Sequence, residues 1–211
     1  MEEQPSVITI GHQIGSGGAY IGQKLAERLG VPFIDRELLK NVAARLHLAE
    51  DELAEREQRL TPAWQSFSWA AEYIDPAKSI YADSYVPTDK EVFDFEAEYI
   101  VGIAKKQSAI FLGRCGHYLL REHPRHFRLL VHADLPARIQ RVCELYRLSP
   151  TQAEKMIDLN DRERSAYIYK FTRQNWLEPR QYDLCVNTTT VGLDKTVEMV
   201  LACVKDKTYR L

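Results

Sequence analysis

The sequence predicts an α/β fold in which about five parallel strands alternate with helices. Three observations support this prediction. Short β-branched runs recur along the chain, most are followed by apolar residues at helical spacing, and a cluster of glycines follows the first run. Because parallel strands are joined by crossovers that usually contain a helix, this alternation favours a parallel sheet covered by helices.

The first part of the chain alternates between strand and helix. Val7–Ile10 is a β-branched run that stops before a glycine, which predicts a buried strand. Apolar residues at every fourth position over 21–29 predict a helix, and Gly30 should end it. Val31–Asp35 is then the second predicted strand, and Arg36–Leu48 has the apolar spacing of a further helix.

The middle of the chain contains no clear strand pattern. Glu50–Arg59 is densely charged and predicts a solvated helix, Pro62–Tyr85 is rich in aromatic residues, and a helix is predicted from about Asp89 to Lys106. We interpret residues 50–106, approximately, as a helical insertion. Because Trp and Tyr are enriched at interfaces, its aromatic part could form a small core or a homodimer contact.

Strands and helices alternate again in the last part of the chain. Ser149, followed by Pro150 and then Gln152, has the pattern of a helix N-cap. The predicted strands here are Ala109–Gly113, Phe127–Val131 and Tyr182–Asn187, and the predicted helices are Pro136–Leu148, the helix capped by Ser149, and an amphipathic helix over 193–204.

Composition excludes several classes of protein. The chain has 211 residues, a length typical of one domain, and a formal charge of -2, which gives no reason to expect nonspecific nucleic-acid binding. No apolar run approaches the length of a membrane span, and the N-terminus lacks a secretory pattern. The four cysteines are widely spaced, which fits a cytoplasmic location, and we expect Cys185 and Cys203 to pack as small hydrophobic residues.

The glycine cluster after the first strand is the strongest local signal of a binding site. Gly15, Gly17 and Gly18 lie between a predicted strand and a predicted helix, where backbone N–H groups and the helix dipole together favour an anion such as phosphate. A tight turn without a ligand would leave the same pattern. The lysine of the pattern G-x-x-x-x-G-K-[ST] is missing, since Gly18 stands in its place, and Tyr20 stands where a magnesium-binding hydroxyl is often found. The chain matches only half of the dinucleotide-binding pattern G-x-G-x-x-G, and Asp35 lies near the position of the acidic residue that follows this pattern.

Several blocks of the chain resemble the cytidylate kinase-like proteins, which are P-loop nucleoside monophosphate kinases. The blocks occur in the family's order: Ile8–Ile10, Gly15–Gly18 with Ile21–Gly22, Leu25–Gly30, Pro32–Asp35, Gly113–Gly116, Asp161–Arg164 with Tyr167 and Asn175–Trp176, and Tyr182–Thr188. The resemblance implies a P-loop three-layer fold with a single domain over 1–211, a helical insertion at about 50–106 and a helical lid at about 150–178. The stretch 56–89 matches poorly.

The resemblance also implies an activity and a set of site residues. The activity is transfer of the γ-phosphoryl of ATP, with Mg2+, to a (d)CMP-like nucleoside monophosphate. In this reading Arg164, Asp161 and Arg114 are catalytic, Asp35, Arg36 and Arg114 bind the acceptor, no residue is assigned to a metal, and the donor phosphates are bound by Gly15, Ser16, Gly17, Gly18, Ala19 and Tyr20.

Each assignment leaves an alternative open. Arg114 could pair with a carboxylate, and Arg162 and Arg164 could form surface pairs with Asp158 or Asp161; we favour the surface for Arg162 and the lid for Arg164. Asp35 could cap a helix that begins at Arg36, and His12 could touch phosphate.

The function also leaves alternatives open. Family members usually carry a basic residue where this chain has Ala19, so the loop lacks a side-chain cation at both Gly18 and Ala19. One alternative is therefore a nucleotide-binding regulatory protein that is catalytically weak or inactive. A second is an NAD(P)-binding protein, which the arginine-bearing block at 161–164 argues against.

Overall fold

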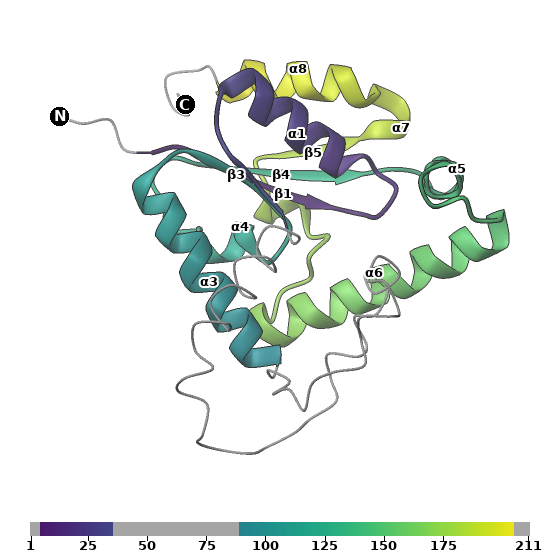
Figure 1. Ribbon diagram of the computed structural model, residues 1–211, viewed down its shortest axis with the longest axis horizontal. Coiled ribbons are helices and arrows are strands. Elements are labelled where there is room, and N and C mark those ends of the chain that lie inside the picture. The colour runs from purple at the N-terminus through teal and green to yellow at the C-terminus, as the bar shows by residue number, and fades with distance from the viewer. Residues whose placement is uncertain (1–4, 36–88, 205–211) are drawn as a thin grey trace, which may run out of the picture.

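The computed structural model describes residues 5–35 and 89–204, which form an α/β fold around one five-stranded parallel sheet (Figure 1). The strand order is β2-β3-β1-β4-β5, with β1 at the centre, which confirms the predicted fold class. The strands are β1 (Val7–His12), β2 (Phe33–Ile34), β3 (Ala109–Leu112), β4 (His126–His132) and β5 (Leu184–Asn187).

Helices cover both faces of this sheet. Figure 1 shows α1 and α8 on one face and α3 and α4 on the other, while α6 extends below the sheet towards α5. The helices are α1 (Gly18–Leu29), α3 (Asp89–Lys106), α4 (Gly116–Leu119), α5 (Leu135–Tyr146), α6 (Pro150–Thr172), the 3-10 turn Pro179–Gln181, α7 (Thr188–Val191) and α8 (Leu193–Val204). The helices predicted at Arg36–Leu48 and Glu50–Arg59, and the aromatic stretch Pro62–Tyr85, lie outside the described residues.

The alternation of side chains along β1 divides the core into two clusters. Ile8 and Ile10 pack with residues of α1 and α8, whereas Val7 packs with residues of α3 and β3. Since successive strand residues point to opposite faces, a strand buried on both sides must be apolar at consecutive positions. The consecutive apolar residues Val7 and Ile8 at the start of β1 are therefore the sequence signature of a central strand.

Two expectations about the strands are corrected by the structure. β1 continues past Ile10 to His12, because Gly11 and His12 still pair with β4. Cys185, expected to pack as a small hydrophobic residue, is exposed. It lies on the edge strand β5, where alternation turns Val186 into the core and Cys185 away from it.

Two predicted helix ends are confirmed in detail. Gly30 ends α1 in the left-handed region with φ 66°, and its N–H is donated to the carbonyl of Ala26. Ser149 and Gln152 form a reciprocal capping box at the start of α6, in which Ser149 N donates to Gln152 Oε1 at 2.9 Å. The α6 helix covers most of the predicted lid segment, although the domain boundaries themselves stay predictions. None of the helices in the described ranges combines the length and apolar character that crossing a bilayer requires.

Candidate active site

The residues predicted to act on a ligand gather at the carboxyl edge of the sheet. The glycine loop follows β1, Arg114 follows β3 after one glycine, and Asp35 follows β2 directly. In open parallel sheets, ligands bind outside the carboxyl ends of the strands, near the point where the strand order reverses. Here that point lies beside the central strand β1, where the glycine loop begins. Arg36, predicted to bind the acceptor, lies outside the described residues.

The glycine loop has the backbone geometry of an anion site. Gly15 and Gly17 adopt left-handed conformations with φ 75° and 87°, which side chains disfavour. Gly17 is the N-cap of α1, and as a glycine it has no side chain that could cap the first N–H groups of the helix. The loop therefore presents the start of a 12-residue helix as a bare, electropositive backbone.

Five consecutive carbonyl groups of the loop, from His12 to Ser16, each accept a hydrogen bond. The donors are Arg164 Nη1 to His12 O, Ser16 N and Oγ to Gln13 O at 3.1 and 2.7 Å, Arg138 Nε to Ile14 O at 2.7 Å, Arg141 Nη1 to Gly15 O at 3.1 Å, and Thr188 Oγ1 to Ser16 O at 2.8 Å. The C=O and N–H groups of one peptide unit point in opposite directions. The carbonyls of Ile14 and Ser16 are held by neighbouring helices, so the N–H groups of Gly15 and Gly17 point away from those helices.

Arg138 on α5 is the buried centre of this anchoring. Its side chain is 5% exposed and makes two 2.8 Å hydrogen bonds to the carboxylate of Asp161 while its Nε holds the loop. Asp161, predicted to form a lid pair with Arg164, contacts Arg138 and reaches the loop through it. Neither Arg138 nor Arg141 was predicted from the sequence, although their spacing places both on adjacent turns of one helix.

Arg164 on α6 reaches the loop directly. Its Nη1 donates to the carbonyl of His12, and its guanidinium carbon lies 5.5 Å from the ring centroid of buried Trp176. Arg162 behaves differently: it pairs with Asp158 on the exposed side of the helix, in agreement with the surface interpretation. The two arginines of one block, two positions apart, therefore lie in opposite environments.

Arg114 forms a buried ion pair with Glu96 of α3. Its Nε lies 2.7 Å from Glu96 Oε2, a second bond joins Nη2 to Oε1, and the side chains are 13% and 6% exposed. Tyr167 of α6 donates its hydroxyl to Glu96 at 3.2 Å, and its ring centroid lies 5.0 Å from the Arg114 guanidinium. The pairing alternative is therefore present in the structure, with a carboxylate that the sequence did not indicate as functional.

Electrostatics and backbone geometry both single out this ion pair. Burial alone would lower the pKa of Arg114, but Glu96 and Tyr167 together raise it. Burial raises the pKa of the neighbouring Cys115 thiol to about 12, so the thiol stays protonated. Gly113, Arg114 and Cys115 have φ values of 72°, 51° and 56°, and two consecutive residues with side chains in the left-handed region store strain of the kind found at functional sites.

The remaining residues of the predicted donor site differ in their exposure. Ala19 and Tyr20 are exposed on the first turn of α1, and the Tyr20 hydroxyl donates to Asp194 of α8 at 2.7 Å. That hydrogen bond raises the pKa of Tyr20. Ser16 is fully buried, with its hydroxyl on the carbonyl of Gln13. The Tyr20 hydroxyl is thus engaged with α8 in this conformation.

Buried histidines predict a loss of stability in mild acid, and two of them are His126, the first residue of β4, and His117 of α4. Burial, and next the charge of Arg128, lower the pKa of His126 to about 4, and burial also lowers the pKa of His117 to about 4. The unfolded chain binds these protons near pH 6.5, whereas the folded chain does not until about pH 4. These two groups should therefore lower the free energy of unfolding by about 2–3 kcal/mol between pH 7.5 and pH 5.5, and His12, whose pKa is also lowered by burial, adds to this loss.

Urea unfolding at the two pH values measures this effect. The variant His126→Gln should lose about 1 kcal/mol less than the parent protein over the same interval, because one of the titrating groups is gone. An unchanged free energy of unfolding between pH 7.5 and pH 5.5 would contradict neutral burial of these rings.

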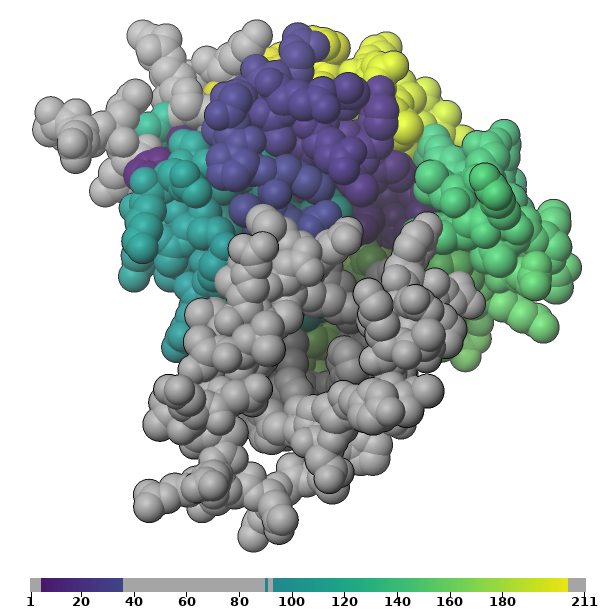
Figure 2. All heavy atoms as spheres, viewed as in Figure 1, coloured from purple at the N-terminus to yellow at the C-terminus, as the bar shows by residue number. Residues whose placement is uncertain are grey.

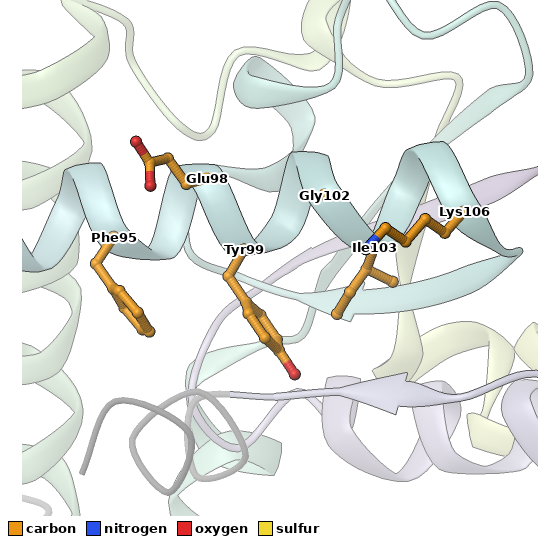
Figure 3. Close-up of a pocket in the computed structure, with 6 residues that line it drawn as sticks. All are labelled: Phe95, Glu98, Tyr99, Gly102, Ile103 and Lys106. Carbon is orange, nitrogen blue, oxygen red and sulfur yellow. The ribbon is translucent and has the colours of Figure 1, made fainter. Parts of the chain in front are cut away.

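Two surface hollows lie on helices near the site. Figure 3 shows the first, of about 300 Å³, along α3, where Phe95, Tyr99 and Ile103 point in the same direction and Glu98 points in another. All the described residues that line this hollow belong to α3, and none of them belongs to the glycine loop. The second, of about 550 Å³, lies along α6 beside Asp161 and Trp176, and so adjoins the residues that contact the loop. In Figure 2, the visible face shows the N-terminal segment in purple meeting α5 in green.

Comparison with known proteins gives a family and a fold. The sequence profile described as the cytidylate kinase-like family matches residues 7–190. No curated protein sequence matches the chain. Among solved structures, an uncharacterized protein from Eubacterium ventriosum ATCC 27560 is similar, with 22% identity over 96% of this chain and 99% of that chain and a TM-score of 0.70. This similarity supports a common fold.

Two further solved structures are more distant. A shikimate kinase from Bacteroides thetaiotaomicron is 13% identical over 95% of this chain and 98% of that chain, with a TM-score of 0.47. A gluconokinase from Sinorhizobium meliloti 1021 is 12% identical over 96% of this chain and 99% of that chain, with a TM-score of 0.46.

Proposed function

Because the chain belongs to the cytidylate kinase-like family, we propose that it is a nucleoside monophosphate kinase that transfers the γ-phosphoryl of ATP to a (d)CMP-like acceptor. The observation that carries this proposal is the glycine loop with its carbonyls held by Arg138, Arg141 and Arg164. Such a loop binds phosphate through its backbone, and phosphoryl transfer needs little more from a protein than positioning and charge neutralisation.

Arginines supply the positive charge that the loop sequence lacks. Arg141 lies against Gly15 and Thr188 and is only half-buried, so part of its guanidinium can face a bound triphosphate. Arg164 comes from α6, the predicted lid helix, and contacts the loop at His12. We assign the donor phosphates to Gly15–Tyr20 and charge stabilisation during transfer to these two arginines. Their presence weakens the argument for an inactive regulatory protein, which rested on the missing lysine.

Arg114 is proposed to bind the acceptor's phosphate, with Asp35 at the same edge of the sheet. Glu96, which also accepts a hydrogen bond from the Tyr167 hydroxyl, holds the Arg114 guanidinium in one orientation. An arginine whose side chain is already fixed loses less conformational entropy when a phosphate binds. The same contacts join the acceptor side of the site to α6, the helix that carries Arg164.

Magnesium fits this site as part of the nucleotide complex. Within residues 5–35 and 89–204, no three His, Cys, Asp or Glu side chains gather as a metal-binding group. Mg2+ in kinases commonly keeps several waters and is held by substrate phosphates with one or two carboxylates, so such a group is not required. When bound, the metal neutralises charge on the β- and γ-phosphates.

A coupled assay with ATP, Mg2+ and a panel of CMP, dCMP, UMP and AMP tests the proposed activity. We expect transfer to at least one acceptor, with CMP or dCMP preferred. A folded sample that transfers phosphate to none of them would contradict the proposal.

A thermal-shift panel separates the remaining alternatives. Ligands at about 100 times their Kd stabilise by about 2.7 kcal/mol, which should raise the unfolding midpoint by about 5–10 °C. Shifts with ATP and CMP are expected. A shift with ATP but no turnover would favour a regulatory protein, and a shift with NAD alone would favour a dinucleotide-binding protein.

A further inference from the structure

The space beside Gly18 is already filled by another side chain of the site. A Cβ atom built on Gly18 would lie 2.5 Å from His12 Cβ and 2.7 Å from His12 Cγ, closer than real Cβ atoms approach. Gly18 begins α1 and, unlike Gly15 and Gly17, has an ordinary negative φ, so its backbone would accept any residue. Space, rather than backbone conformation, therefore requires glycine at this position.

This position is the one that carries lysine in ordinary phosphate-binding loops. There the side chain leaves the first turn of the helix and its ammonium group reaches the β- and γ-phosphates. In this chain, such a side chain would have to begin where His12 lies. The missing lysine and the histidine at the end of β1 are thus two aspects of one packing arrangement.

We propose that His12 takes the place of the loop lysine, positioning the start of α1 and offering a neutral imidazole to the donor phosphates. This inference rests on the proposed kinase function for its ligand, although the packing of His12 against Gly18 does not. A neutral imidazole donates one hydrogen bond and accepts one, whereas a lysine donates three and carries a charge.

A second observation supports a ligand at this ring. Nδ1 of His12 is buried and has no hydrogen-bond partner among the described residues. Nearly all buried polar atoms in proteins are paired, so an unpaired ring nitrogen beside a phosphate-binding loop calls for a partner that binds there. Burial, and next the positive charge of Arg164, hold the pKa of His12 well below its ordinary value, which keeps the ring neutral. The charge on bound phosphates must then be balanced by arginines such as Arg141.

The packing half of the inference is tested by stability. Gly18→Ala should lower the midpoint of thermal unfolding by about 4 °C or more, because the new methyl group overlaps His12. When His12 is already replaced by alanine, Gly18→Ala should lower the midpoint by at most half as much as it does in the parent protein. Gly102→Ala is the matched control, since a Cβ there meets no described atom within 4 Å and the midpoint should not fall. If Gly18→Ala lowered the midpoint equally in the parent protein and in the His12→Ala variant, the packing argument would be overturned.

The ligand half is tested by calorimetry with ATP and Mg2+. His12→Phe keeps a ring against Gly18 without its nitrogens and should weaken ATP binding about fivefold. His12→Ala with Gly18→Lys should bind ATP about tenfold more tightly than His12→Ala alone, because a charged donor replaces the neutral one. Gly18→Lys in the presence of His12 should lose stability and gain no affinity.

The outcomes separate this inference from the kinase proposal. Unchanged ATP affinity in His12→Phe, or tighter ATP binding by Gly18→Lys at an unchanged unfolding midpoint, would overturn the role of His12. If the parent protein binds no nucleotide, the kinase proposal and the ligand role both fail, while the coupling between positions 12 and 18 still reports on the packing.

Discussion

Replacing Arg164 by alanine should lower turnover about a thousandfold, while lowering the free energy of unfolding by only about 1–2 kcal/mol. In the structure this arginine bonds to the carbonyl of His12 and lies over Trp176, so it connects α6 to the phosphate-binding loop. A planar guanidinium at that place can stabilise charge that spreads over the transferring phosphoryl. The measurements are kcat with the preferred acceptor and urea unfolding of the same samples.

Arg162 provides a matched control on the same helix. It is exposed and pairs with Asp158, so Arg162→Ala should change both turnover and stability little. Arg164→Lys keeps the charge but loses the planar arrangement of donors, and should recover only part of the activity. If Arg164→Ala retained more than about a third of the parent kcat, the assignment of this residue to the transition state would be wrong.

Replacing Glu96 by alanine should lower the free energy of unfolding by about 3–5 kcal/mol, because it leaves a buried guanidinium without its carboxylate. Arg114 and Glu96 are nearly inaccessible to water, so solvent cannot replace the lost partner. The Tyr167 hydroxyl loses its acceptor in the same change, and burial raises its pKa so that it stays protonated. Chemical denaturation of the parent protein and the variant measures the difference.

The same helix offers the comparison for Glu96. Asp94 pairs with Lys90 on the exposed side of α3, and Asp94→Ala should cost about 0.5 kcal/mol or less. A double variant, Glu96→Leu with Arg114→Met, removes both charges and should regain much of the stability lost by Glu96→Ala. It should still lack acceptor binding. A cost below about 1 kcal/mol for Glu96→Ala would show that the pair contributes little to the fold.

The sheet was predictable from the sequence because its signals are local. A central strand that is buried on both faces needs consecutive apolar residues, and Val7 and Ile8 supply them. Helix ends follow from single residues, as Gly30 and Ser149 demonstrate. The glycine loop was recognisable for the same reason, since strand, turn and helix start are adjacent in the chain. Which residues of an edge strand are buried was not predictable from the sequence. The prediction that Cys185 packs as a small hydrophobic residue was therefore wrong.

The contacts that complete the site were missed because their partners are distant in the sequence. Arg138 lies 23 residues from Asp161 and 124 from Ile14, and nothing local distinguishes it from a surface arginine. Glu96 left a weaker but readable signal. It shares a helix face with Ile100 and Ala104, both buried, and a carboxylate within an apolar stripe implies a buried partner.

The anchored carbonyls of the glycine loop also constrain the order in which the protein can fold. Only the bond from Ser16 to Gln13 is local; the others span 124, 126, 152 and 172 residues. Contacts of such separation form late, after the entropy of closing long loops has been overcome. A nascent chain that has emerged only as far as β4 therefore contains every glycine of the phosphate-binding loop but lacks the long-range contacts that fix the loop's conformation. Competence to bind nucleotide should arise in one step, when α5, α6 and α7 dock.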